Sequence, residues 1–347
     1  MMSVKKETMF TKKWNSLLDL FGEDKRDIYF TESYAALYED ESSKAECFVY
    51  KEGDNVLIFP YIKREIALLS GYYDFETPYG YGGPIANTDD VAFIERAFDA
   101  FSSAAGENKM VAGLIRFHPL LDNQAPFKVK SGVVFDRKTV AMDLTPEAEK
   151  IWEEQIHSKH RNSIRKAEKA GLLFTVDTDL SCMDIFMNMY KETMERLEVP
   201  SFYYFSRGYF EGMKALKGDA FFGIVSLGNK PIAGGLFFKH GIFGHYHLAG
   251  SLDEYKEYTP NNFLLYNTAL YLKSKGVKLF HLGGGSDTDP DNKLYKFKRR
   301  FSDNERSFHI GKIVLNESVY KKVCDIWEEK FPEKKNKYKN FLLKYSY

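Results

Sequence analysis

The spacing of apolar and polar residues in the first half of the chain predicts a strand hairpin followed by a helix and a further strand. Residues 45–66 alternate like two strands around a turn at Glu52 to Asn55. Residues 91–105 carry apolar side chains at helical spacing, and residues 111–117 form a short buried strand.

The second half of the chain repeats this order. Residues 220–241 predict a hairpin, and residues 242–250 predict a further strand. An amphipathic helix follows at 261–276 and a buried strand at 277–282. A duplicated α+β unit is the simplest explanation of the two similar halves.

A predicted helix over residues 144–171 links the two halves. Thr145 is placed as its N-cap, and Pro146 follows in the first turn, where a helix tolerates proline. Gly171 is a natural helix stop. We therefore place the domain boundary at this helix.

Three segments follow from this reading. With 347 residues and 44% hydrophobic positions, the chain can fill two cores. The predicted domains are residues 1–144, residues 145–316, which begin with a basic helix, and a helical, lysine-rich tail at residues 317–347.

Composition points to a cytoplasmic protein without an integral membrane segment. The N-terminal residues lack the apolar core of a signal peptide, and no run approaches the roughly 20 apolar residues of a membrane span. Three widely spaced cysteines offer neither a disulfide framework nor a metal or redox motif.

Basic residues gather in two clusters although the net charge is zero. Residues 157–171 hold five basic residues and one acid, and residues 293–300 hold five basic residues and no acid. Such local clusters in a neutral protein favour a directed anion site.

The first cluster aligns three cations on one helix face. Arg161, Arg165 and Lys169 follow one another at four-residue spacing, where like charges repel by a few tenths of a kcal/mol per pair. A bound anion would offset this cost. A solvated face relieved by Glu168 is the alternative.

Three glycines, Gly283, Gly284 and Gly285, follow the predicted strand at 277–282. They allow the backbone to approach another group closely, although the spacing of a Walker loop is absent. Asp287, Asp289 and Asp291 alternate as in a calcium loop, but the glycine and the glutamate of such a loop are missing. These acids are therefore expected to shape a turn around Pro290.

The second basic cluster is expected to form a short helix with one buried face. Leu294, Phe297 and Phe301 have the spacing of that face, and Lys298 next to Phe297 projects towards a pocket. A lysine held in this way can stabilise the charge that develops on a carbonyl oxygen, or it can anchor a phosphate.

His245 and His247 fall on the same side of a predicted strand, as in the start of a metal site. No third ligand with suitable spacing is evident, so packed or hydrogen-bonded histidines are favoured. The sequence predicts neither a metal nor a cofactor.

Five segments together resemble the Fem-type aminoacyltransferases, which build peptidoglycan cross-bridges and belong to the wider GNAT acyltransferase superfamily. They are TPYGYGGP, RFHP, SKHRNSIRKAEKAG, TPNNFLLYNTA, and LGGG with LYKFKRRF, and they span Thr77 to Phe301. The resemblance implies an α+β fold of two tandem GNAT-like subdomains, each a mixed sheet flanked by helices. Because no heptad segment lies between Gly171 and Ala220, the long coiled-coil arm is not expected.

The resemblance also implies an enzyme that transfers an aminoacyl group from aminoacyl-tRNA to an amine of a UDP- or lipid-linked muropeptide. Lys298, with Phe297 beside it, would stabilise the oxyanion. The implied donor or phosphate contacts are Arg161, Arg165, Lys169, Gly283, Gly284 and Gly285. The implied acceptor contacts are Tyr79, Tyr81, Arg207, Tyr246 and His247.

Two alternatives stay open at this point. One is an N-acyltransferase of the same fold that uses an acyl thioester such as acyl-CoA on an amino sugar or a peptide. The other is a non-catalytic binding module. The residues Ser251 to Asn261 contain no glycine, which argues against the diphosphate cradle of acetyl-CoA. The oligomeric state, the amino acid and the general base are left open.

Overall fold

The computed structural model describes residues 6–127, 132–200, 203–289 and 291–347. It divides into two compact units, of which the first comprises Met1–Asp136 with Ser307–Tyr347 and the second comprises Arg137–Arg306. These bounds differ from the three segments expected from the sequence, because the C-terminal residues return to the first unit.

The first unit contains a mixed sheet in the order β1-β2-β3-β4-β6-β13. Only β4 and β6 are parallel among these neighbours, and β5 pairs with β3 off this path. The strands are β1 (Lys6–Thr11), β2 (Ser43–Glu52), β3 (Asn55–Glu65), β4 (Tyr73–Glu76), β5 (Ile85–Ala86), β6 (Met110–Arg116) and β13 (Glu305–Val314).

Helices cover the sheet of the first unit through three clusters of buried side chains. The helix α3 buries Phe93, Phe98 and Phe101 against the aromatic face of the strands. The helices are α1 (Asn15–Leu18), α2 (Glu32–Ala36), α3 (Val91–Glu107), α10 (Glu317–Lys330) and α11 (Lys335–Tyr338). The helix α10 packs Trp327 against β6, so the tail is part of this core.

The second unit contains a mixed sheet in the order β7-β12-β11-β10-β9-β8, in which only β11 and β12 are parallel neighbours. The strands are β7 (Val133–Asp143), β8 (Leu172–Asp177), β9 (Ala220–Leu227), β10 (Lys230–His240), β11 (Phe243–Ser251) and β12 (Leu279–Gly284). Each unit therefore has a hairpin, a strand, a helix and a parallel strand in the same order, which confirms the predicted duplication.

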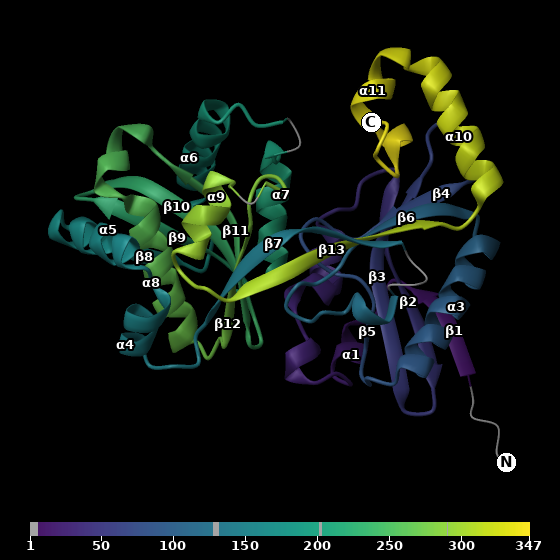
Figure 1. The fold of residues 1–347 in the computed structure, drawn as a ribbon, viewed down its shortest axis with the longest axis horizontal. Helices are drawn as coiled ribbons and strands as arrows, with labels where there is room; N and C mark the ends of the chain where they lie inside the picture. Colours follow the sequence, from purple (N-terminus) through teal and green to yellow (C-terminus); the bar gives the residue numbers. More distant parts are fainter. Residues whose placement is uncertain (1–5, 128–131, 201–202, 290) are drawn as a thin grey trace. The chain divides into compact units, whose positions relative to one another are not determined.

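Helices lie on both faces of the second sheet (Figure 1). On β9, Phe221 faces Tyr271 of α8, whereas the next residue, Phe222, stacks on Phe186 of α6. This alternation buries both faces of the strand. The helices are α4 (Ala148–Lys150), α5 (Ser158–Lys169), α6 (Met183–Arg196), α7 (Arg207–Gly212), α8 (Pro260–Ser274) and α9 (Lys293–Arg299).

The strand that follows each parallel pair in the sequence forms hydrogen bonds with the parallel pair of the other unit. The strand β7 follows β6 in sequence but pairs with β12 of the second unit. The strand β13 follows β12 but pairs with β6 of the first unit. Because β13 pairs with a strand of the first unit, the residues after Arg306 belong to that unit.

The linking helix predicted over residues 144–171 is wrong as a single element. The chain forms α4, a π-helical segment at Ile151–Gln155, an extended residue at Ile156, and then α5. His157 caps α5 by accepting a hydrogen bond from the backbone of Lys159. Thr145 is therefore not the N-cap, whereas Gly171, with φ +78°, ends the segment as predicted.

Helix lengths limit what the described part of the chain can form. No helix within it is both long and apolar enough to cross a membrane. Between Gly171 and Ala220 the longest described helix is α6, with 14 residues. This agrees with a fold that lacks the coiled-coil arm.

Candidate active site

Two neighbouring strands separate in the middle of the second unit. The parallel strands β11 and β12 pair only over three positions, which end at His245 and His281. Beyond that point β11 continues beside β10 and β12 continues beside β7. Tyr246 on β11 and Gly284 on β12 therefore lie where the two strands have parted.

Lys298 of α9 reaches both of these strands. Its Nζ donates a hydrogen bond to the carbonyl oxygen of Gly284 at 2.8 Å and lies 5.3 Å from the ring centroid of Tyr246. The side chain is buried, with 7% of the residue exposed. A buried nitrogen with remaining N–H groups can donate to a substrate carbonyl or phosphate oxygen held nearby.

The surroundings of Lys298 disfavour its charged form. Burial, followed by the positive charge of Arg137, lowers the pKa of Lys298 to about 7. Arg137 belongs to β7, and its side chain is held by a hydrogen bond from Nη1 to the carbonyl oxygen of Gly285 at 3.0 Å. Near neutral pH this lysine can therefore gain or lose a proton.

The glycines have structural reasons to be glycines. A Cβ on Gly284 would lie 2.7 Å from the carbonyl oxygen of Lys138 on β7, and a Cβ on Gly285 would lie 2.6 Å from the Asn292 side chain. The carbonyl groups of Gly284 and Gly285 accept hydrogen bonds from Lys298 and Arg137. The backbone of Gly284 and Gly285 thus approaches other groups of the protein closely. Contact with an acyl donor is not needed to explain why these positions are glycine.

The two basic clusters of the sequence lie beside each other in this unit. His160 of α5 donates from Nε2 to the carbonyl oxygen of Phe297 at 2.9 Å, and the backbone of His157 donates to the carbonyl oxygen of Arg300 at 2.8 Å. Burial, followed by the charges of Arg300 and His157, lowers the pKa of His160 to about 4. A neutral His160 thus joins α5 to α9 at neutral pH.

The aligned cations of α5 have different surroundings. Arg161 donates from Nη1 to the carbonyl oxygens of Trp152, Glu153 and Ile156, which fastens the end of the π-helical segment. Arg165 lies 5.2 Å from the Trp152 ring, and Lys169 is exposed. Arg161 therefore has a structural role that does not require an anion.

Other exposed cations on these helices are available to an anion. They form no ion pair with any residue that the structure describes, and we call them the α5/α9 cations. This set consists of Lys159, Lys166, Lys169, Lys293 and Arg300.

The stretch before α9 is a capped turn. Asn292 accepts hydrogen bonds from the backbones of Leu294 and Tyr295, and Asp291 pairs with Lys296 at 2.6 Å. Pro290 lies outside the described residues. Leu294 is 41% exposed, so the predicted apolar face of α9 is wrong at this position, where the short helix turns away from the core.

The residues expected on β11 separate onto opposite faces. Tyr246 stacks on Phe237 on the face with Lys298, whereas His247 packs on Phe238 and bonds Tyr209 of α7 at 2.7 Å. Burial, followed by nearby His245, lowers the pKa of His247 to about 3, so it is neutral at neutral pH. The structure therefore does not bring Tyr246 and His247 together.

The other predicted acceptor contacts are distributed over both units. Arg207 of α7 is exposed and pairs with Asp184 at 2.5 Å and with Glu211 at 2.8 Å. Tyr79 and Tyr81 belong to the first unit, where the Tyr79 carbonyl accepts a hydrogen bond from Tyr34. Tyr81 packs edge-on against Tyr29.

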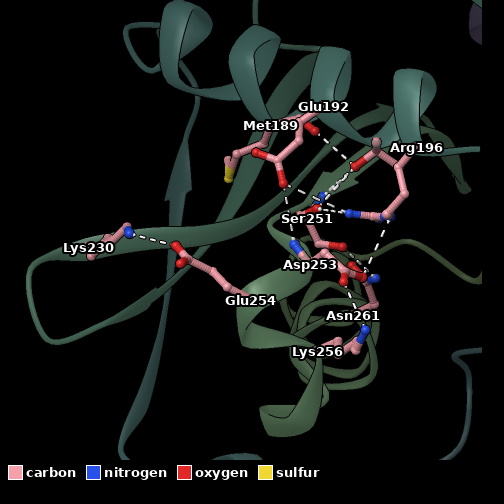
Figure 2. A network of polar contacts seen from close by, with 10 residues as sticks. Met189, Glu192, Arg196, Lys230, Ser251, Asp253, Glu254, Lys256 and Asn261 are labelled. Carbon is pink, nitrogen blue, oxygen red and sulfur yellow. Dashed lines mark hydrogen bonds and ion pairs between the residues drawn. The ribbon is translucent and has the colours of Figure 1, made fainter.

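Polar contacts hold the segment between Ser251 and Pro260, which joins β11 to α8 (Figure 2). Arg196 of α6 donates to the carbonyl oxygen of Ser251 at 3.2 Å and pairs with Asp253 at 3.7 Å. Asn261 donates to the Ser251 hydroxyl at 3.2 Å. Lys230 pairs with Glu254 at 2.8 Å. Asp253 and Glu254 of the segment are therefore both paired with cations.

The first turn of α8 offers few backbone donors. Pro260 has no N–H group, and the N–H group of Asn262 bonds the carbonyl oxygen of Thr259. Thr259 adopts a left-handed conformation with φ +53°, and its hydroxyl lies 2.8 Å from the carbonyl oxygen of Ser163 on α5. A diphosphate is cradled by several N–H groups in a row, and this turn does not provide them.

Sequence reasoning missed two residues that shape the site. Arg137 lies on β7, and no local pattern links this strand to α9. His160 lies within the basic helix, and its burial at 3% exposed could have been read only from its spacing to Ile164 and Ala167, which share the buried face.

Residues 155–299 match the family model of the acetyltransferase (GNAT) domain. The matched range contains α5, the diverging strands β11 and β12, and α9. The second unit therefore carries a GNAT domain, and this match defines the class of protein as an acyltransferase.

Solved structures extend the similarity over most of the chain. The crystal structure of FemX matches with a TM-score of 0.70 and 16% identity, over 91% of this chain and 99% of that chain. The C-terminal domain of a protein described as a lysylphosphatidylglycerol synthetase from Agrobacterium fabrum matches with a TM-score of 0.56 and 13% identity, over 88% and 91% of the two chains. A tandem GNAT protein from the clavulanic acid biosynthesis pathway matches with a TM-score of 0.52 and 8% identity, over 90% and 99%.

The comparison with curated proteins finds no match. At the identities of the solved structures, what the chains share is the fold. The expected fold of two tandem GNAT-like subdomains is thereby confirmed.

Proposed function

We propose that this protein transfers an aminoacyl group from aminoacyl-tRNA to the amine of a cell-wall peptide precursor and so forms an amide bond. The observation that carries the proposal is the burial of Lys298 between the diverging strands β11 and β12, with its Nζ bonded to Gly284. The GNAT acyltransferase domain and the fold shared with FemX support it.

In the proposed reaction, the acceptor amine attacks the carbonyl carbon of the aminoacyl ester. The carbonyl oxygen becomes an oxyanion, and protonated Lys298 donates a hydrogen bond to it. The ester C–O bond then breaks, the amide forms, and the proton released by the amine is taken up by the departing ribose oxygen. A preorganised donor at a developing oxyanion contributes about 3–4 kcal/mol in comparable sites.

The charge distribution supports a tRNA donor. The α5/α9 cations lie on the helix that carries Lys298, at its C-cap and on the helix bonded to it, and phosphates bind such side chains through charge. The turn between β11 and α8 has few available N–H groups, which disfavours the diphosphate of CoA.

The proposed acceptor is a UDP- or lipid-linked muropeptide, by similarity of fold to FemX. Tyr246 is the best-placed acceptor contact, because it lies on the face of β11 that Lys298 shares. Contact by Arg207 would require release of Asp184 and Glu211. Tyr79 and Tyr81 remain proposed contacts, whereas contact by His247 would have to be made on the opposite face of β11.

The test supplies the protein with charged tRNA carrying radiolabelled amino acids and a UDP-linked muropeptide. Acetyl-CoA is supplied as the rival donor in a parallel reaction. We expect label to move from tRNA to the muropeptide. A domain that matches the acetyltransferase model favours a second candidate, N-acylation from an acyl thioester. If acetyl-CoA reacts while the label stays on tRNA, that candidate replaces the proposal.

The lysines of α5 are expected to set the salt dependence of tRNA binding. Replacing Lys159, Lys166 and Lys169 by alanine should reduce the slope of log affinity against log salt by about 2–3, because each phosphate contact contributes roughly 0.7–0.9. Filter binding over a salt series measures this slope. A matched variant without Lys12, Lys191 and Lys214, which are exposed elsewhere, should keep the slope. Equal slopes in both variants would contradict a tRNA site on α5.

Transfer activity is expected to decline as the pH rises through about 7. The folded-state pKa of Lys298 is about 7, so the protonated donor is present below this pH and lost above it. Lys298→Arg keeps its charge throughout, so its lower activity should not show this decline. The pH dependence of kcat for both enzymes checks the prediction. A decline at the same pH in Lys298→Arg would assign it to another group.

A further inference from the structure

The C-terminal end of the chain is strongly basic. The residues Lys330–Tyr347 include six lysines and one glutamate, a net charge of +5 in a chain whose net charge is zero. Figure 1 shows this part in yellow, with α11 following α10. The catalytic proposal uses none of these residues.

The segment is held on the first unit by buried contacts. Leu343 and Tyr345 are 5% and 7% exposed and pack with Trp327 of α10. Trp327 donates from Nε1 to the carbonyl oxygen of Tyr347 at 3.1 Å, and Tyr320 donates to the carbonyl oxygen of Leu342 at 2.7 Å. The outward-facing residues of the segment therefore belong to an ordered surface.

Three aromatic rings form the apolar part of this surface. Tyr338 and Tyr347 stack at 4.8 Å, and Phe341 lies 5.4 Å from Tyr338 and 5.3 Å from Tyr347. Phe341 is 48% exposed and Tyr347 is 49% exposed. A cluster of aromatic side chains thus faces outward although a buried core lies directly beneath.

Lysines surround the aromatic cluster. Lys334 lies 4.6 Å from the Phe331 ring and Lys337 lies 5.1 Å from the Tyr338 ring, whereas Lys339 is exposed in the next turn. Lys335 and Lys344 are both paired with Glu328 at 2.6 Å. Lys334, Lys337 and Lys339 form no ion pair within the described part of the chain. Together with Tyr338, Phe341 and Tyr347 they make up what we call the C-terminal patch.

We propose that the C-terminal patch docks the protein on the surface of a membrane that contains anionic lipids. Lysines near such a surface are attracted by the lipid phosphates, and aromatic side chains prefer the depth of the headgroups. The positive charge of the patch complements this partner. Nucleic acid fits less well, because Tyr338 and Tyr347 stack on each other and each thereby loses one face on which a base could stack.

The experiment uses the full chain without substrates, so its outcome does not depend on the proposed transfer reaction. The protein is sedimented with vesicles of equal parts phosphatidylglycerol and phosphatidylcholine, and with vesicles of phosphatidylcholine alone. We expect binding to the anionic vesicles at low salt. Replacing Lys334, Lys337 and Lys339 by alanine should weaken it about 100-fold, since each lysine contributes roughly fivefold.

Two further variants separate the contributions to docking. Phe341→Ser should weaken binding about tenfold and leave its salt dependence unchanged, because it removes apolar contact alone. The variant without Lys12, Lys191 and Lys214 should bind like the wild type. Loss of binding in this control to the same extent as in the patch variant would reduce the effect to net charge and overturn the proposal.

The proposal is also overturned if the wild type does not sediment with anionic vesicles. If the patch variant instead loses affinity for tRNA while vesicle binding is unchanged, the patch is a nucleic-acid surface. Circular dichroism of each variant checks that the substitutions leave the fold intact.

Discussion

Replacing Lys298 by methionine is expected to lower kcat/KM for acyl transfer by about 10²–10³-fold. The substitution removes the Nζ that faces the separated strands but keeps an unbranched side chain of similar length. The loss corresponds to one oxyanion donor, about 3–4 kcal/mol of transition-state stabilisation. Steady-state transfer to the acceptor measures it, and Lys298→Arg, which keeps a charged donor, should retain part of the activity.

We do not expect the loss of activity to come from a lower stability of the folded protein. Lys298 is 7% exposed and bonds the neutral carbonyl group of Gly284, so an apolar replacement does not leave an unpaired buried charge. We expect the free energy of unfolding of Lys298→Met to equal or exceed that of the wild type. A variant that unfolds normally and transfers at the wild-type rate would remove Lys298 from the mechanism.

Replacing His118 by alanine is expected to lower the free energy of unfolding by about 3–5 kcal/mol. Asp27 and His118 are both 0% exposed, and Asp27 Oδ2 lies 2.8 Å from His118 Nε2. The backbone of Leu120 donates to His118 Nδ1, so Nε2 carries the proton and donates to the carboxylate. Without the histidine, the buried Asp27 carboxylate keeps the backbone N–H of Ile28 but loses its hydrogen bond to His118. Equilibrium unfolding in urea measures the change.

A matched substitution shows how much burial contributes to this effect. Lys13, whose side chain is 89% exposed, pairs with Glu32 at 3.5 Å. Its replacement by alanine should cost less than about 1 kcal/mol, because water screens the exposed lysine and Glu32 keeps its hydrogen bonds from the backbones of Trp14 and Asn15. A cost below about 1 kcal/mol for His118→Ala as well would show that the Asp27 carboxylate is satisfied without the histidine.

The order of elements could be predicted because its signals are local. The periods of strand and helix place the hairpins, α3, α8 and the strands that follow them within a few residues of their observed bounds. The same local signals failed in the linking helix. Its apolar and charged residues suit a helix throughout, but Ile156 is extended, and Arg161 fastens the preceding carbonyl groups.

The exchange of strands could not be predicted. A strand sequence specifies which residues face the core, but its hydrogen-bonding partner is chosen among all strands of the fold. The pairing of β7 with β12 and of β13 with β6 is therefore a property of the tertiary structure. It returns the tail to the first unit, and it brings Arg137 to the site.

The candidate site was predicted in part for the same reason. The sequence by itself determined that a lysine stands beside Phe297 in a basic helix after three glycines, and that the fold is duplicated. Only the tertiary structure decided that this lysine is buried between the separated strands and lies near Arg137. Burial, followed by the charge of Arg137, lowers the pKa of Lys298 to about 7. Desolvation and charge act through space, so residues far apart in the chain set the chemistry of the site.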